Sequence, residues 1–242
     1  MRFKAMILAA GRGERMRPLT DSRPKPLLMA GNRMLIEHQI IRLARAGFTH
    51  LVINHAYLGE MIEHALGDGQ RYGAHILYSP EHVVLETAGG IANAMPLLTG
   101  TNTNSGRPFL VVNADVYCEF DYTRLLPVLQ ALLCGNADRL AHLVLVDNPA
   151  HHVAGDFALN NGTVELTDEK QLTFSGIGVY HPVLFNGVAP GRPEKLAPLL
   201  RAAITERKVT GEYFSGIWED VGTPERLRQL DRQLTGRRAD ND

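Results

Sequence analysis

The sequence predicts an α/β protein with a doubly wound, mixed but mostly parallel sheet that carries helices on both faces. Two observations lead to this fold class. Short apolar runs alternate with segments of helical periodicity up to residue 146. The apolar runs are continuous, as in strands that are buried on both faces of a sheet. Because parallel sheets bind ligands at the carboxyl ends of their strands, we expect the functional residues there.

Length and composition limit the possible functions. The chain has 242 residues, 45% of them hydrophobic, which is enough for a full core. A formal net charge of −1 argues against a nucleic-acid-binding protein held by bulk charge. There is no signal-peptide pattern, and no apolar run reaches the roughly 20 residues of a membrane span. Cys118 and Cys134 are far apart in the sequence and match no metal-binding or redox spacing, so we expect two reduced thiols. We therefore expect a cytoplasmic protein that binds neither nucleic acid nor a membrane.

Five strands and four helices are expected up to residue 146. Residues 5–10, AMILAA, form the kind of short apolar run found in buried strands. In residues 34–46 apolar side chains recur with a period near 3.6, which predicts a helix, and Gly47 suits its C-terminal cap. Asp121 suits the N-terminal cap of a later helix. The strands are expected at residues 5–10, 50–54, 74–78, 109–113 and 140–146, and the helices at residues 34–46, 59–66, 90–98 and 121–133.

The second part of the chain has a different pattern. Asn161-Gly162 between two short apolar segments predicts a hairpin over residues 156–166. Thr223 and Pro224 suit the start of a last helix. Further strands are expected at residues 175–180 and around Trp218 within residues 213–221, and further helices at residues 195–207 and 224–234. We expect a single domain over residues 1–236, with parts 1–150 and 151–236, and a polar tail at residues 237–242.

A glycine loop follows the first expected strand. Gly11 and Gly13 allow the backbone to approach a ligand closely and to point its amides at phosphate oxygens. Taken alone, this spacing is also that of an ordinary tight turn. A dinucleotide-binding loop would have a small residue in place of Met16 and an acidic residue near Asn54, and a P-loop would continue with Gly-Lys-Ser/Thr. The sequence therefore matches neither of these two phosphate loops.

Lys25 lies between two prolines shortly after the glycine loop. Pro24 and Pro26 restrict the backbone around this lysine, because proline limits its own conformation and that of the preceding residue. Pro-Lys-Pro alone is typical of an ordinary loop. Beside the glycine loop and Arg15, it indicates a fixed cation that faces an anionic ligand.

Residues 8–27 read LAAGRGERMRPLTDSRPKPL. This segment resembles the signature of the sugar-1-phosphate nucleotidyltransferases, in which G-x-G-x-R-x-x-P-L-T follows a strand and P-K-P comes next. The similarity is strongest over residues 4–115 and 211–227. It implies the nucleotide-diphospho-sugar transferase fold, which is Rossmann-like and GT-A-like. Residues 1–150 would then bind the nucleotide and residues 151–236 the sugar.

The resemblance also implies roles for single residues of the first part. Gly11, Gly13 and Glu14 would bind the nucleotide. Arg15 would contact the β- and γ-phosphates that leave as pyrophosphate, and Lys25 would contact the α-phosphate and the sugar phosphate. Arg15 and Lys25 are therefore the candidate catalytic residues.

Two aspartates are the candidate metal ligands. Asp115 follows the apolar run 109–113, so the predicted sheet places it at a carboxyl end, where its hard oxygen atoms suit Mg²⁺. Asp220 lies in WEDVGTP, and the resemblance to the family motif W-x-D-V-G-T-P implies that it is the second carboxylate. Capping of a turn or helix is the alternative for both residues. Glu219 is less suitable, because neighbouring side chains on a strand point to opposite faces.

Further candidates lie in later glycine-rich runs. The resemblance favours base binding by Gly89 and Gly90 in LETAGG, with Glu81 as a further nucleotide-binding residue. Asn113 is a candidate contact of the ribose or the sugar. Many family members have E-K-P before a later strand, but residues 169–171 here read EKQ, so we place the other sugar contacts elsewhere. These sugar-binding candidates are Gly155, Ser175 and Gly176.

Together these features predict a Mg²⁺-dependent enzyme whose substrates are UTP and a sugar 1-phosphate. Within the family the chain is most similar to uridylyltransferases, and the sugar that this implies is N-acetylmuramic acid α-1-phosphate, in peptidoglycan recycling. No Ser-His or Cys-His arrangement is evident, and transfer of UMP needs no protein nucleophile. The alternatives are a guanylyl- or thymidylyltransferase for mannose or glucose 1-phosphate, and a catalytically silent nucleotide-sugar sensor. We expect a monomer or a small homo-oligomer.

Overall fold

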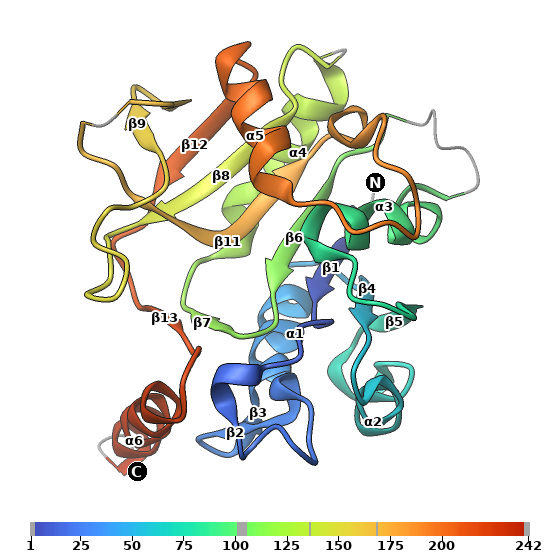
Figure 1. Ribbon diagram of the computed structural model, residues 1–242, viewed down its shortest axis with the longest axis vertical. Helices are drawn as coiled ribbons and strands as arrows, with labels where there is room; N and C mark the ends of the chain where they lie inside the picture. The colour runs from blue at the N-terminus through green and yellow to red at the C-terminus, as the bar shows by residue number, and fades with distance from the viewer. Residues whose placement is uncertain (1–2, 101–105, 136, 168, 240–242) are drawn as a thin grey trace.

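A nine-stranded sheet forms the centre of the protein (Figure 1). The computed structural model describes residues 3–100, 106–135, 137–167 and 169–239. Across the sheet the strands follow the order β5-β4-β1-β6-β11-β8-β12-β10-β9. Their bounds are β1 Ala5–Leu8, β4 His50–His55, β5 His75–Pro80, β6 Phe109–Asn113, β8 Ala141–Val146, β9 Ala158–Asn160, β10 Thr163–Glu165, β11 Thr173–Tyr180 and β12 Val209–Tyr213.

The sheet is mixed but mostly parallel, as the sequence predicts. β1 pairs in parallel with β4 on one side and β6 on the other, so that Ala5 lies between Leu51 and Leu110. β11 is antiparallel to both of its neighbours, β6 and β8, and β12 is again parallel to β8. The carboxyl ends of β1, β4, β5 and β6 therefore meet at one end of the sheet, toward the bottom of Figure 1.

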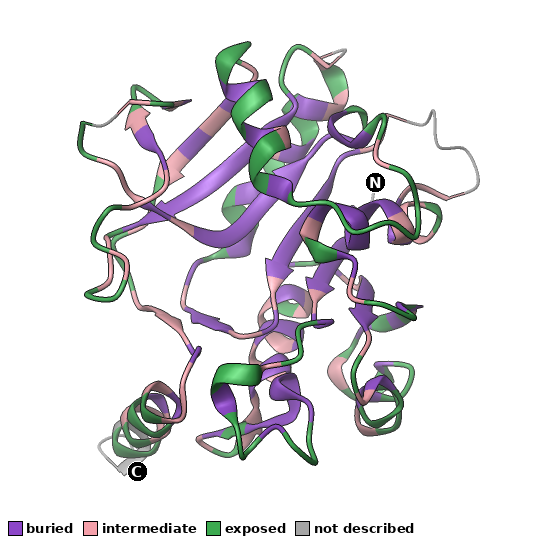
Figure 2. Cartoon of the chain, in the orientation of Figure 1, coloured by how far each residue is buried: buried purple, intermediate pink, exposed green. Residues whose placement is uncertain are grey.

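Helices cover both faces of this sheet. Side chains alternate along the central strands, so Ala5 and Ile7 face one hydrophobic core and Met6 faces the other. Helices α1, α2 and α4 complete the first core, and α3 and α5 complete the second. Figure 2 shows that the central strands are buried along most of their length. The helices are α1 Leu35–Arg45, α2 Gly59–Leu66, α3 Glu86–Thr99, α4 Leu125–Cys134, α5 Leu196–Thr205 and α6 Pro224–Ala239. Within the described ranges, no helix has both the length and the apolar character that crossing a bilayer requires.

A third, smaller core joins the C-terminal helix to the beginning of the chain. Met16, just after the glycine loop, packs in one cluster with Val221 and with Leu230 of α6. Asp231 accepts a hydrogen bond from Gly31 N–H at 2.8 Å. The short strands β2 Met29–Ala30 and β3 Arg33–Met34 lie at the same end of the molecule as α6 (Figure 1). The last part of the chain is thereby held beside the loop that follows β1.

Most predicted elements have ends within a few residues of those expected. α2 spans the predicted residues 59–66, and β6 spans the predicted residues 109–113. Asn161 and Gly162 both have positive φ and join β9 to β10, as this hairpin turn requires. Asp121 accepts a hydrogen bond from Thr123 N–H and caps a short 3-10 turn that leads into α4.

Three elements differ from the prediction. α3 begins at Glu86 instead of Gly90, because a distant carbonyl, Glu194 O, accepts the hydrogen bonds of Ala88 and Gly89 N–H in its first turn. The strand predicted around Trp218 is β13 Trp218–Asp220, which pairs with β7 Val116–Cys118, but β12 Val209–Tyr213, which joins the main sheet beside β8, is a further strand that the sequence did not predict. α6 continues to Ala239, three residues into the segment predicted as a tail.

Gln39 of α1 is a buried polar side chain that connects this helix to the segment after β6. Only 1% of the residue is exposed. Its amide nitrogen donates to Val116 O at 2.5 Å, and its amide oxygen accepts a hydrogen bond from the Tyr122 hydroxyl at 2.5 Å. Since both partners lie in the interior, the amide satisfies two groups that water cannot reach.

Replacing Gln39 by Leu should therefore lower the free energy of unfolding by about 3 kcal/mol, because two buried polar groups lose their partner. Urea denaturation measures the loss. Gln130→Leu on the exposed side of α4 is the control, with an expected change within about 0.5 kcal/mol. A loss below about 1 kcal/mol for Gln39→Leu would contradict the role of this amide.

Candidate active site

A cleft of about 930 Å³ opens at the carboxyl ends of the parallel strands. The sequence predicts a ligand at this place, because the loops after neighbouring parallel strands meet there. Lys25, Pro26 and Gly222 line part of the cleft. The remaining walls are residues 8–16 after β1, Asn54 in β4, residues 81–84 and 86–87 after β5, and residues 113–115 after β6.

The loop after β1 depends on Gly13. This residue has a φ of +65°, and a Cβ atom added here would lie 3.1 Å from Lys25 Cβ and 3.0 Å from Thr20 Cγ2. Glycine alone fits this conformation and this spacing without strain. The Thr20 hydroxyl and Met16 N–H both donate to Gly13 O, at 2.9 and 2.8 Å. The exposed residues of this loop that line the cleft include Gly11, Glu14 and Arg15.

Lys25 is in direct contact with Asp115. The lysine is only 7% exposed and begins the 3-10 turn Lys25–Leu27. Its Nζ lies 2.6 Å from Asp115 Oδ2. The attraction offsets the cost of removing the ammonium group from water. The structure thus brings together Lys25, the predicted phosphate contact, and Asp115, the predicted metal ligand.

Asn54 and Glu81 connect two walls of the cleft. Both are buried, with 2% and 7% of each residue exposed. Asn54 Oδ1 accepts a hydrogen bond from Ala9 N–H at 2.9 Å, and its Nδ2 donates to Glu81 Oε1 at 2.7 Å. Glu81 Oε2 accepts from Leu85 N–H at 3.0 Å. Burial raises the pKa of Glu81, and the hydrogen bonds from Asn54 and Leu85 oppose this rise. These bonds hold the loop after β5 against the end of β1.

Asp220 comes to the same region from the other end of the chain. The short antiparallel sheet of β7 and β13 places Asp220 opposite Val116. Val221 N–H donates to Asp115 O at 3.0 Å. The two candidate metal ligands are thus on adjacent backbone segments, although Asp220 itself is not among the residues that line the cleft.

Both aspartate side chains already have cationic partners. Asp220 Oδ2 lies 2.8 Å from Arg226 Nη1 and 3.4 Å from His151 Nε2, much as Asp115 contacts Lys25. Two carboxylates that attract positive charge suit Mg²⁺, which commonly binds one or two carboxylates together with substrate phosphates. In the part of the chain that the structure describes, no three His, Cys, Asp or Glu side chains form a potential metal cluster. A metal ion held by these two carboxylates would take its other ligands from water or from a substrate.

Gly89 and Gly90 lie in the first turns of α3 and do not line the cleft. Gly89 N–H donates to Glu194 O at 3.1 Å. A Cβ atom at Gly90 would lie 2.7 Å from Glu81 Oε1 and 2.9 Å from Asn54 Nδ2. In the structure, these glycines allow α3 to pack closely, and Gly90 lies directly behind the hydrogen-bonded pair of Asn54 and Glu81.

The four candidate sugar-binding residues do not form one group. Asn113 lines the cleft, and Gly176 is against it, because a Cβ atom at Gly176 would lie 2.6 Å from the Asn113 amide nitrogen. The Ser175 hydroxyl is buried and donates to Val144 O at 2.6 Å. Gly155 has a φ of +70° and lies in a turn outside the cleft lining. Asn113 and Gly176 are thus the pair that the structure brings together.

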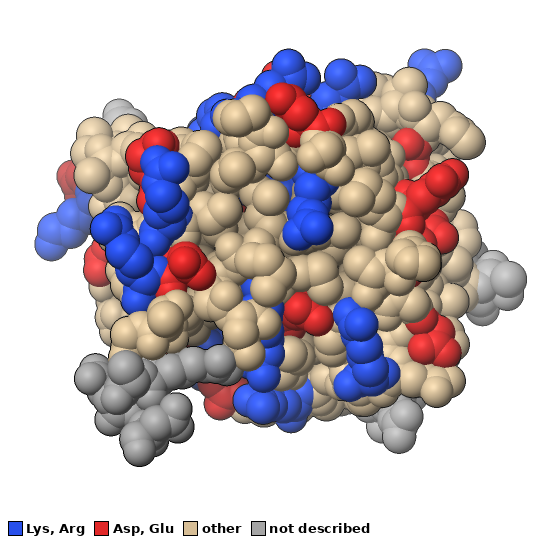
Figure 3. Space-filling model, turned by 90° about the horizontal axis from the view of Figure 1, so that it is seen from below, with Lys and Arg blue, Asp and Glu red and all other residues tan. Residues whose placement is uncertain are grey.

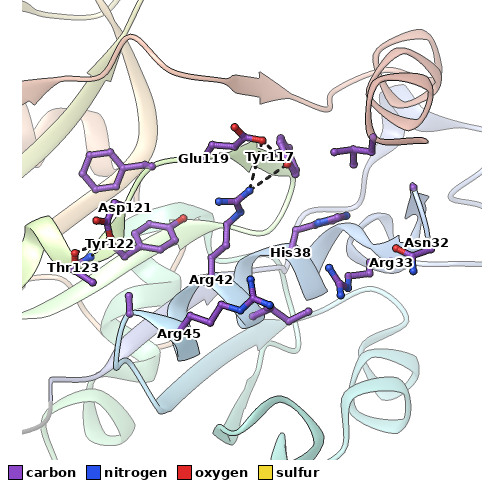
Figure 4. A pocket seen from close by; sticks show the side chains of 15 residues that line it. Asn32, Arg33, His38, Arg42, Arg45, Tyr117, Glu119, Asp121, Tyr122 and Thr123 are labelled. Carbon is purple, nitrogen blue, oxygen red and sulfur yellow. Dashed lines mark hydrogen bonds and ion pairs between the residues drawn. The ribbon is translucent and has the colours of Figure 1, made fainter. Parts of the chain in front are cut away.

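A second pocket of about 430 Å³ lies beside α1 (Figure 4). His38, Arg42 and Arg45 come from this helix, and Tyr117 and Glu119 come from the facing segment. Arg42 Nη2 donates to the Tyr117 hydroxyl at 3.2 Å and lies 3.8 Å from Glu119 Oε1. None of the candidate catalytic, substrate-binding or metal-binding residues lines this pocket.

The charged side chains near the cleft are mixed in sign. Figure 3 shows the molecule from below, with Lys and Arg in small groups among Asp and Glu. This mixture agrees with the net charge of −1. The positive charges that line the cleft are thus those of single side chains such as Lys25 and Arg15, and no extended basic surface surrounds them in this view.

The chain is similar in sequence and in fold to known nucleotidyltransferases. Residues 4–150 match the family model described as Nucleotidyl transferase. An N-acetylmuramate alpha-1-phosphate uridylyltransferase from Neisseria meningitidis serogroup B is 50% identical over 231 residues, which are 94% of this chain and 96% of the relative. A mannose-1-phosphate guanylyltransferase catalytic subunit beta from Dictyostelium discoideum is 29% identical to this chain. The aligned region covers 92% of this chain and 62% of that protein. The crystal structure of apo UDP-glucose pyrophosphorylase has a TM-score of 0.74 and 17% identity, over 98% of this chain and 100% of the other, and shares its fold.

Three residues of this region, Asn54, His151 and Arg226, are not among the site residues predicted from the sequence. Asn54 has one usable signal, since a polar residue follows an apolar strand run there. Arg226 lies within residues 211–227, where the resemblance is strong, but the resemblance implied no role for it, and its contact with Asp220 six residues away is local. His151 has no signal, and it meets Arg226 only because α6 and the loop after β8 come together in the folded chain.

Gly90→Ala is expected to lower the free energy of unfolding by about 1–3 kcal/mol, because the new methyl group would overlap Glu81 and Asn54. Gly236→Ala in α6 is the matched control. A Cβ atom there would have no neighbour within 4 Å, so alanine should stabilise the helix by up to about 1 kcal/mol. Urea unfolding measures both changes, and a Gly90→Ala protein at least as stable as the wild type would show that α3 packs less closely than described.

Proposed function

This chain belongs to the nucleotidyl transferase family, and on that premise we propose that it transfers UMP from UTP to N-acetylmuramic acid α-1-phosphate. The products are the UDP-sugar and pyrophosphate. The observation that carries the proposal is the contact of Lys25 with Asp115 beside the glycine loop, in a cleft at the strand ends. The Neisseria relative, 50% identical over nearly its whole length, supports the choice of nucleotide and sugar.

In the proposed reaction an oxygen of the sugar 1-phosphate attacks the α-phosphorus of UTP. The bond from this phosphorus to the bridging oxygen of pyrophosphate breaks. Because the attacking oxygen is already anionic at neutral pH, no side chain has to act as nucleophile. The rate then depends on alignment of the substrates and on neutralisation of their charge.

The loop after β1 supplies the proposed phosphate contacts. Backbone amides of Gly11 and Gly13 would bind phosphate oxygens of the nucleotide. Arg15, exposed on the same loop, would bind the β- and γ-phosphates. Lys25 would bind the α-phosphate and the sugar phosphate, next to the atoms that react. Glu14 lines the cleft beside them and is a further proposed nucleotide contact.

Asp115 and Asp220 would hold a divalent cation, which we propose is Mg²⁺. When bound, the cation would supply charge neutralisation and orientation of the triphosphate. Lys25 and Asp115 would then exchange partners, with the carboxylate facing the cation and the ammonium group facing phosphate. The 2.6 Å contact between them supports this, because it shows that a cation already lies against the carboxylate.

The base and the sugar are proposed to lie on either side of this centre. Glu81 lines the cleft on the side of the loop after β5, and Gly90 packs behind that wall, whereas Gly89 packs against the backbone of Arg192 and Glu194. Asn113 is the proposed contact of the ribose or the sugar, with Gly176 against its amide. Gly155 and Ser175 remain predictions for the sugar side.

We further infer that the enzyme acts in the cytoplasm, as a monomer or a small homo-oligomer, in the recycling of peptidoglycan. Its substrates would be small anions, without a nucleic acid or a membrane as partner. The near-neutral net charge supports this, since it provides no bulk attraction to a polyanion.

Purified protein with Mg²⁺ should release pyrophosphate when UTP and N-acetylmuramic acid α-1-phosphate are both present, and EDTA should stop the reaction. We expect kcat/KM to be at least tenfold higher for this sugar than for glucose 1-phosphate or N-acetylglucosamine 1-phosphate, or about 1.4 kcal/mol in transition-state binding. GTP with mannose 1-phosphate and dTTP with glucose 1-phosphate are the comparison reactions. Faster turnover with either pair would contradict the proposal, and UTP binding without any turnover would favour a sensor.

Lys25→Ala should lower kcat by about 100-fold or more, with a much smaller change in KM for UTP, because the contact strengthens as charge develops during transfer. Lys25→Arg should restore little activity, since a planar guanidinium does not replace a compact ammonium group. Lys208→Ala, in an exposed pair with Glu206, is the control and should keep wild-type kinetics. An unchanged kcat in Lys25→Ala would limit this lysine to ground-state binding.

A further inference from the structure

Arg226 places a second guanidinium group beside the glycine loop. A Cβ atom added at Gly222 would lie 2.5 Å from Arg226 Nη2 and 3.3 Å from Arg15 Nη2. Gly222 and Arg15 both line the cleft. Arg15 and Arg226 therefore flank one glycine at the cleft wall. Guanidinium groups are strong donors to phosphate oxygens, so two of them here suit a ligand with several phosphate charges.

The position of Arg226 is unfavourable for its own helix. It is the third residue of α6, where the helix dipole favours acidic side chains and opposes a positive charge. Its side chain is only 18% exposed, so the charge is also largely removed from water. Arg228, two residues further, is 66% exposed and pairs with Glu225 at 2.7 Å. Arg226 is thus placed by its partners outside the helix.

Those partners are Asp220 and His151. Arg226 Nη1 donates to Asp220 Oδ2 at 2.8 Å and lies 2.8 Å from His151 Nε2. The guanidinium group therefore binds one carboxylate oxygen of a proposed metal ligand. Its second terminal nitrogen, Nη2, is the one beside Gly222 and the cleft. One side chain is in reach of both the carboxylate and the cleft wall.

We propose that Arg226 exchanges partners when UTP binds. While Asp220 has no divalent cation bound, the guanidinium group of Arg226 pairs with that carboxylate. Once a cation is bound there, the guanidinium group pairs with the triphosphate, next to Arg15. This inference rests on the proposed function, because it needs a triphosphate in the cleft. Glycine at position 222 supports it, since any Cβ atom there would occupy the space that Arg226 Nη2 uses.

The exchange would couple metal binding to phosphate binding. Without a divalent cation, Asp220 both repels the triphosphate and retains Arg226. With the cation in place, the repulsion is neutralised and the guanidinium group becomes a phosphate donor. A salt bridge that only stabilises the fold would not respond to the metal in this way.

The test compares UTP binding by calorimetry in EDTA for the wild type, Asp220→Asn, Arg226→Gln and the double variant. Asp220→Asn releases Arg226 without metal, so it should bind UTP about tenfold more tightly than the wild type. Arg226→Gln should stay within about twofold of the wild type, because in EDTA its arginine is already paired with Asp220. The double variant should lose the gain, which a double-mutant cycle measures directly. If the double variant keeps the gain, relief of repulsion explains it and the exchange is wrong.

The same proteins are then titrated with UTP in Mg²⁺. Arg226→Gln should now bind UTP at least fivefold more weakly than the wild type, whereas Arg228→Gln, on the same helix, should bind as the wild type does. Arg226→Lys should recover part of the affinity, which separates a lost charge from a disturbed helix. Equal UTP affinities of Arg226→Gln and the wild type in Mg²⁺ would overturn the partner exchange but would leave the proposed function standing. Absence of UTP binding by the wild type in both buffers would overturn the proposed function as well.

Discussion

The ion pair of Lys25 with Asp115 joins two loops that are 90 residues apart in the sequence, and the arrangement of the cleft depends on it. Gly13 packs directly on the lysine side chain, so the glycine loop takes its position from Lys25. Asp115 in turn accepts a backbone hydrogen bond from Val221, which places the last strand. A buried ammonium group is unfavourable without a partner. The ion pair and the backbone hydrogen bond of Asp115 thus bring three separate segments together at the cleft.

The charged side chains at the cleft are arranged in pairs of opposite sign. The proposed reaction brings two anions together, so their mutual repulsion is the main obstacle to be reduced. The structure places cations and carboxylates in contact: Lys25 with Asp115, and Arg226 with Asp220. In the proposed reaction each carboxylate would bind a divalent cation, and each paired cation would bind phosphate. The charged groups that pair with one another within the protein are thus the groups that we propose for binding the metal ion and the phosphates.

The sheet explains why these groups can meet. Loops after β1, β4, β5 and β6 lie together because the strands are parallel and end at the same level. Asn54 and Glu81 then connect two of these loops by buried hydrogen bonds. The C-terminal helix α6 closes the arrangement from the other side, since its Leu230 shares a small core with Met16. The last part of the chain thereby contributes to a site that the first part begins.

The sequence by itself determined the features that depend on neighbouring residues. Continuous apolar runs predict the buried strands, Asn161-Gly162 predicts the hairpin, and the signature around Gly11 and Lys25 predicts the family and the place of the cleft. These features are local, because strand burial, turn conformation and loop constraint follow from a few adjacent side chains.

Only the tertiary structure decided which distant groups meet. The early start of α3 depends on Glu194 O, and the separate strand β13 depends on β7 as its partner. Arg226 lies near Arg15 at the cleft wall only because α6 packs against the beginning of the chain. No periodicity or spacing in the sequence records such meetings. They result from burying several apolar surfaces at once, and that packing can be seen only in the folded chain.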